Sequence, residues 1–161
     1  MTATPFRAVL LRELAGIRAQ LEAYDTDQQI WSLPPNLPNS AGTLALHLAG
    51  NLSHFVGTVL GGTDYVRDRD AEFADRDLPR AELLRRLNQA GDTIAAVLGD
   101  GPADATDRSV EVAGVNLPVP VLLGHLVAHL AYHLGQIDYH RRIVTGRADA
   151  LGMVSPKALN L

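Results

Sequence analysis

The chain has 161 residues, of which 47% are hydrophobic and 20% charged, and its formal net charge is −4. This composition is typical of one globular domain with a sizeable core, residues 1–161, and without a basic run it favours neither nucleic acid nor a membrane surface as partner. The sequence has no cysteine, which excludes disulfides, thiolate zinc sites and a cysteine nucleophile. Because the first residues lack the layout of a signal peptide, we expect a cytoplasmic protein.

Two helices are predicted in the first 62 residues. The first begins at Thr4, a capping residue before a proline, and carries apolar residues every three or four positions to Tyr24. Three prolines between residues 31 and 39 end it. The second helix runs from about Ser40 to Gly61-Gly62. Its uncharged stretch has the length of a membrane span, but its histidines and Asn51 favour a buried helix of a bundle.

Two more helices are predicted after a charge-dense linker at residues 63–78. The third helix runs from Pro79 to Gly99, and the fourth from about residues 118–120 to Thr145-Gly146. Residues 103–117 fit either a small hairpin or a loop, and residues 146–161 form a tail without a strong period. Four helices predict an all-α four-helix bundle, in which the long linker between helices two and three permits a parallel pair.

Histidines at positions 125, 129 and 133 are the main sign of chemistry in the sequence. Residues four apart on a helix lie roughly 5–6 Å from each other, so neighbouring imidazoles can share one metal ion. A single histidine on an apolar face is usually a core or boundary residue bonded to a backbone carbonyl or water, and we expect that role for His54, His125 or His140 taken alone. At the end of its helix, His140 could also complement the helix dipole. His129 and His133, one turn apart, are instead expected to bind one metal ion together.

The surrounding residues show that this histidine pair belongs to neither of two familiar metal-binding motifs. The His-Glu-x-x-His motif of zinc proteases needs a glutamate where this chain has Leu130. Di-iron bundles need inward glutamates, which helices two and four do not supply. We therefore expect an all-imidazole site for a borderline ion, Zn²⁺ or Ni²⁺, with His47 or His54 as the third ligand. Spacing alone does not choose between those two.

Three segments resemble the DinB-like superfamily, over about residues 1–145. They are Leu44 to Leu52, Arg67 to Phe73, and the pattern His129-x-x-x-His133-x-Gly135-Gln136. The resemblance implies an up-down-down-up four-helix bundle, often a homodimer, with a divalent metal held by His47, His129 and His133. His54 and His125 fall outside that triad, as supporting or structural residues.

The resemblance also implies a class of reaction. Some members are thiol S-transferases that use bacillithiol or another low-molecular-weight thiol, and one branch is a mycothiol-dependent maleylpyruvate isomerase. That branch has a glutamate among its metal ligands and matches His129 less well. We expect a metal-dependent transferase or hydrolase in which the ion activates a thiol or water, and the thiol arrives as a cosubstrate. The alternatives are a bundle that binds metal or ligand without turnover, and an oligomerisation scaffold with packed histidines.

Five further positions each have two interpretations. Asn51 and Gln136 either orient a ligand or are buried amides bonded to backbone. Arg67 and Arg69 either bind an anionic cosubstrate or join an ion-pair cluster with the acidic residues of the same linker. Tyr132 is expected to be a packing residue or a dimer contact.

Overall fold

The computed structural model describes residues 3–99, 107–151, 155, 157 and 159. Within these residues the protein is mostly helical, in agreement with the predicted all-α class, and it adds one two-stranded sheet. In chain order the elements are α1 (Thr4–Glu22), α2 (Asp27–Trp31), α3 (Ala41–Leu52), the π-helix η1 (Ser53–Leu60), α4 (Arg69–Ala74), α5 (Arg80–Val97), β1 (Ser109–Val112), β2 (Val115–Pro118) and α6 (Val119–Thr145).

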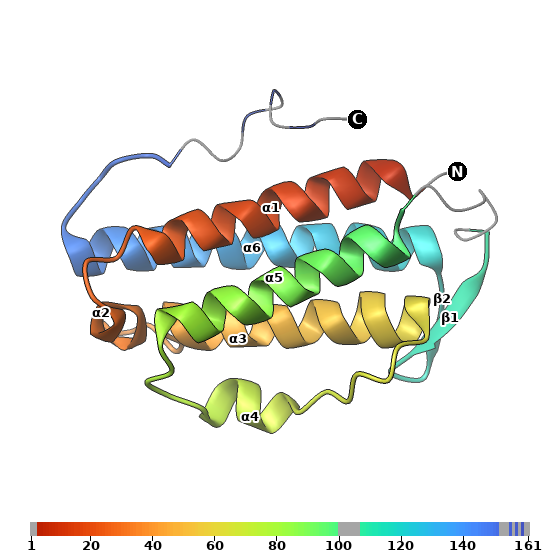
Figure 1. The fold of residues 1–161 in the computed structure, drawn as a ribbon, viewed down its shortest axis with the longest axis horizontal. Helices are drawn as coiled ribbons and strands as arrows, with labels where there is room; N and C mark the ends of the chain where they lie inside the picture. The colour runs from red at the N-terminus through yellow and green to blue at the C-terminus, as the bar shows by residue number, and fades with distance from the viewer. Residues whose placement is uncertain (1–2, 100–106, 152–154, 156, 158, 160–161) are drawn as a thin grey trace.

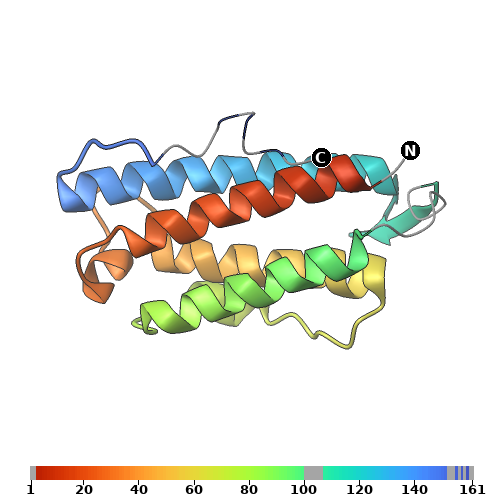
Figure 2. The ribbon, with the colours of Figure 1, turned by 45° about the horizontal axis from the view of Figure 1, so that its top comes forward.

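The long helices lie side by side and enclose the core (Figure 1). Helices α1 and α6 run in one direction, whereas α3 and α5 run in the other (Figures 1 and 2). Each of α1 and α3 contacts both α5 and α6. Their apolar stripes meet in the middle, where burial of each large aliphatic side chain contributes about 1.5–3 kcal/mol. Fully buried examples are Leu10, Ile17, Leu21, Leu48, Leu87, Ile94, Leu126, Leu130 and Ile137.

Two of the predicted helix ends are confirmed, and one is wrong. Ser40 caps α3, since its Oγ accepts a hydrogen bond from the backbone N–H of Thr43 at 3.1 Å. Gly146 ends α6 in the left-handed conformation, with φ at +69°, which glycine adopts without steric cost. Thr4 is not the cap of α1, because Ala3 occupies that position and both Thr4 and Pro5 lie in the first turn.

The predicted second helix is continuous but changes character halfway. Residues 41–52 are α-helical, and the backbone then widens into the π-helix η1, which packs against α5. Wide turns of this kind are rare and often accompany functional sites. No helix among the described residues is both long and apolar enough to cross a membrane.

The connections hold three short elements. The linker predicted at residues 63–78 contains α4, whose N-terminus is capped by Asp68, and α4 packs against α3. The proline-rich connection is preceded by α2, which begins with a capping box at Thr26. Strands β1 and β2 pair as the hairpin that was one of two interpretations of this region. Its turn residues, Ala113 and Gly114, both have positive φ, as the preferred two-residue hairpin turn requires.

Candidate metal centre

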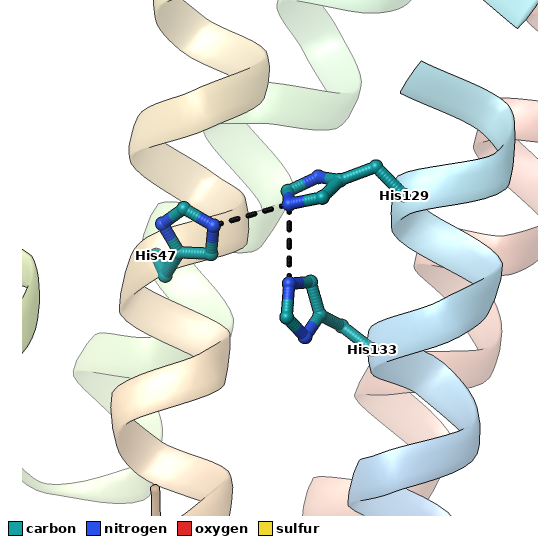
Figure 3. A group of neighbouring side chains, drawn as sticks. All are labelled: His47, His129 and His133. Carbon is teal, nitrogen blue, oxygen red and sulfur yellow. Dashed lines mark hydrogen bonds between the residues drawn. The ribbon is translucent and has the colours of Figure 1, made fainter. Parts of the chain in front are cut away.

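His47, His129 and His133 meet between α3 and α6, and we call them the three-histidine cluster (Figure 3). The Nε2 atom of His129 lies 3.2 Å from Nε2 of His47 and 3.1 Å from Nε2 of His133. One candidate ligand atom from each residue lies within 4.8 Å of the other two. Two nitrogens bound about 2.05 Å from one zinc ion would lie about 2.9 Å apart at a right angle and about 3.3 Å apart at a tetrahedral angle. The observed spacings fall between these values.

A carboxylate on α4 fixes the orientation of His47. Nδ1 of His47 lies 3.0 Å from Oε2 of Glu72, whose residue is only 6% exposed. A carboxylate accepts hydrogen bonds, so Nδ1 carries the proton and Nε2 turns a lone pair toward the cluster. Nη2 of Arg67 is also 3.4 Å from Nδ1, but the shorter contact with the carboxylate decides the tautomer. Metal-binding histidines commonly have such a partner on the second ring nitrogen.

Glu72 is itself held by Arg67 in a two-pronged ion pair. Nε of Arg67 donates to Oε1 at 2.7 Å, and Nη2 donates to Oε2 at 2.8 Å. For Arg67, the structure therefore shows the ion-pair alternative. Burial alone would raise the pKa of Glu72, but the hydrogen bonds from Arg67 and His47 outweigh it and hold the pKa below its ordinary value. Glu72 is thus ionised at neutral pH and its charge is compensated.

His133 is oriented in the same way by an amide from its own helix. Nδ1 of His133 donates to Oε1 of Gln136 at 2.6 Å, one helical turn further along α6. The Nε2 atom then turns its lone pair toward the cluster. Of the two interpretations of Gln136, the structure shows the one in which the amide orients a histidine.

Burial and mutual proximity favour the neutral form of His129 and His133. Desolvation is the main reason why the pKa of His129 falls to about 4, and the neighbouring His133 and His47 lower it further. The pKa of His133 is also below its usual value, mainly through burial. Neutral imidazoles are the form that binds a metal ion. His129 and His133 are therefore in the correct protonation state for metal binding at neutral pH.

Asn51 lies one turn after His47 and is 6% exposed. Its Oδ1 atom is buried and has no hydrogen-bond partner within the part of the chain that the structure describes. A buried acceptor without a partner is costly in free energy, so such groups usually serve a bound molecule or ion. The interpretation of Asn51 as an amide bonded to backbone through this oxygen is therefore not supported.

The remaining histidines lie outside the three-histidine cluster. The exposed His125 stacks on His129, with ring centroids 5.9 Å apart. His54 contacts the ring of Phe55 instead. His140 is 2% exposed and bonds the carbonyl of Ser32 and the hydroxyl of Tyr24. The core interpretation of His140 is confirmed, and its assignment to the helix dipole is unnecessary.

Arg69 and Tyr132 are two further side chains near the site that each had two interpretations. The guanidinium of Arg69 lies over the ring of Phe73, at 5.2 Å from its centroid, and that ring contacts His47. Tyr132 is 64% exposed and its ring contacts His133. Arg69 therefore packs on the aromatic ring that contacts His47. Tyr132 is largely exposed to solvent beside His133.

Sequence reasoning missed the role of Glu72, because a carboxylate among so many charged residues looks solvated. One signal in the sequence bears on it. Gly50 lies one turn after His47, and a Cβ atom at that position would approach Cδ of Glu72 to 2.8 Å. A glycine in the middle of a helix that carries a histidine indicates that another group approaches closely there.

The comparison with known families agrees with the extent of this fold. A family model described as "Protein of unknown function (DUF1572)" matches residues 10–153, so the chain belongs to that family. The matched range contains the three-histidine cluster together with Glu72 and Gln136. No curated protein matches the chain.

Proposed function

We propose that this DUF1572 family member is a divalent-metal-dependent enzyme of the DinB-like superfamily, with Zn²⁺ or Ni²⁺ held by His47, His129 and His133. One observation carries the proposal: three Nε2 atoms converge, while a carboxylate and an amide hold the other ring nitrogens of His47 and His133. The directions of the long helices support an up-down-down-up four-helix bundle (Figure 1). A metal-free scaffold would have no need of such oriented lone pairs.

Different residues would bind the metal, orient its ligands and bind the substrate. A bound ion supplies Lewis acidity, which activates a nucleophile at neutral pH. In this proposal, His47, His129 and His133 hold the ion. Glu72 and Gln136 fix the orientation of two of these rings. The buried Oδ1 of Asn51 is available to accept a hydrogen bond from a bound molecule.

The absence of cysteine shapes the reaction that we propose. A thiol nucleophile cannot come from this chain, so it must enter as a low-molecular-weight cosubstrate. We propose that this thiol loses its proton and that its sulfur forms a bond with an electrophilic carbon of a small molecule, displacing a leaving group from that carbon. The resemblance to the DinB-like superfamily also leads us to propose a homodimer, which sedimentation of the purified protein would test.

A turnover experiment tests the activity. Tag-free protein loaded with Zn²⁺ or Ni²⁺ is incubated with low-molecular-weight thiols and small electrophiles, and thiol consumption is followed over time. We expect consumption by the wild type and by the exposed-ring control His125→Ala, but none above background by His133→Ala. If the loaded wild type and His133→Ala are equally inactive across the screen, the protein binds metal without this turnover.

A further inference from the structure

An apolar groove of about 350 Å³ lies along α6 beside the three-histidine cluster. Its floor includes Leu44, and Leu37 contributes to the wall formed by the loop before α3. Tyr139 and Ile143 form the other wall, and they are 70% and 56% exposed. Large apolar side chains left open to solvent along a groove indicate a surface that binds something.

The groove borders the three-histidine cluster on the side of His133, although none of the three histidines lines it. Gln136 lines it and also accepts the hydrogen bond from His133. Tyr132 lines it and contacts the His133 ring. Leu44 lies one turn before His47 on α3. Since Ile143 is seven residues beyond Gln136, the groove extends about 10 Å along α6 from the edge of the cluster.

The lining of the groove carries no formal charge. Its polar members are Asn39, Gln136, the two tyrosine hydroxyls and His140, whose ring nitrogens already bond Tyr24 and Ser32. An ionic group placed here would lose hydration without gaining an oppositely charged partner. The volume lies within the roughly 300–1,000 Å³ typical of small-molecule sites. Exposed tyrosine rings offer faces for stacking.

We propose that this groove binds an uncharged aromatic or branched alkyl group of the substrate and directs its reactive polar end to the three-histidine cluster. The inference rests on the proposed function for the role of that polar end. The occupant of the groove is an apolar small molecule, because the groove is neutral, has the size for one such group and is lined by Tyr132 and Gln136, which both contact His133.

The first experiment tests the groove without any metal. The neutral fluorescent probe N-phenyl-1-naphthylamine is titrated into metal-free wild type, Ile143→Asp and Val121→Asp. Val121 is a matched control, since it is a β-branched residue of α6, 55% exposed and outside the groove lining. We expect Ile143→Asp to weaken probe binding at least about tenfold and Val121→Asp to leave it unchanged.

The second experiment tests the link to the three-histidine cluster. Zinc-loaded protein is titrated with acetohydroxamic acid, which carries only a metal-chelating group, and with 6-phenylhexanohydroxamic acid, which adds an apolar arm. We expect the arm to tighten binding at least about tenfold in the wild type and Val121→Asp. In Ile143→Asp, the difference should shrink to less than about threefold, while acetohydroxamic acid binds as before.

The outcomes separate this inference from the proposed function. If the wild type binds acetohydroxamic acid but gains nothing from the phenyl arm, the groove proposal is overturned and the metal centre stands. If zinc does not bind but the probe responds to Ile143→Asp alone, the metal proposal fails and the apolar site stands. If Ile143→Asp leaves probe binding intact but separates a dimer into monomers, the groove is an interface between copies and our inference is wrong.

Discussion

Glu72 and Gln136 orient the three-histidine cluster, because each accepts a hydrogen bond from the Nδ1–H group of one imidazole. With that proton engaged, His47 and His133 present their Nε2 lone pairs to the same point as His129. Arg67 holds Glu72 through two hydrogen bonds, so the carboxylate loses little freedom when a histidine is bound to it. The cluster is thus prepared for a ligand before any ligand arrives.

We expect Glu72→Gln to weaken Zn²⁺ binding by about 10- to 100-fold. Glutamine still accepts a hydrogen bond from His47, but it lacks the charge that makes the imidazole a stronger donor. Competition with a chromophoric chelator at pH 7.5 measures the change. Asp70→Asn is the control, since Asp70 is an exposed carboxylate of the same helix α4. Equal loss of affinity in both variants would show that net charge, and not the bond to His47, is responsible.

The lowered histidine pKa values set the pH range of metal binding. The sequence alone suggests that protons displace the metal below about pH 6, the ordinary range of imidazole. Burial lowers the pKa of His129 to about 4 and that of His133 below its usual value, so protons compete only at lower pH. We expect occupancy to hold from pH 8 to about pH 6 and to be lost by about pH 4. Loss of half the metal at pH 7 would contradict this account.

At the scale of elements, α4 is the part that completes the site. This six-residue helix sits in the middle of the crossover between η1 and α5 and packs against α3 (Figure 1). Its Asp68 cap fixes where the helix starts, and Glu72 then falls on the side that contacts Gly50. Without a side chain at residue 50, α4 approaches α3 closely enough for Glu72 to reach His47.

We expect Gly50→Ala to weaken metal binding although alanine favours the helix by about 1 kcal/mol. The added methyl would press on the Glu72 carboxylate, which must move away from His47. Gly124→Ala is the matched control, since a Cβ at this α6 position meets nothing within 4 Å. Chelator competition measures affinity, and urea unfolding measures stability. If Gly50→Ala binds zinc as tightly as the wild type, close packing at this glycine does not position Glu72.

Helices α1 and α5 could be predicted because they repeat apolar residues every three or four positions, as Leu10, Leu14, Ile17 and Leu21 do. Helices α3 and α6 could be predicted because they are nearly uncharged over long spans. Shorter elements have no such period. Helix α4 lies in a charge-dense stretch, and the change from α3 to η1 at Ser53 has no local signal that we can identify. Likewise, the spacing of His129 and His133 predicted that they share a face, but only packing brings Glu72 from the crossover to His47.

For the whole molecule, a buried cation joins the C-terminal segment to the helices. Arg141 is fully buried; it donates to Oε1 of Gln20 on α1 at 2.5 Å and to the carbonyl of Asp149 at 2.7 Å. Its Nη2 atom also lies 3.2 Å from Oδ1 of Asp138, which supplies a carboxylate. Because a buried guanidinium is costly when it loses its partners, each of these contacts depends on the others.

We expect Arg141→Ala to lower the free energy of unfolding by about 3–5 kcal/mol, since buried acceptors lose their donor. Arg147→Ala should cost less than about 1 kcal/mol, because its ion pair with Asp25 lies at the surface. Urea unfolding of the two variants measures both values. Similar costs would mean that the buried network does not stabilise the fold.

Elemental analysis of tag-free protein shows whether the three-histidine cluster binds a divalent metal ion. After incubation with Zn²⁺ and removal of free metal, we expect about one ion per chain in the wild type and in His125→Ala, and below about 0.2 in His129→Ala. If the wild type holds less than about 0.2 ions per chain, or if His129→Ala holds as much metal as the wild type, the three-histidine cluster is not a metal site.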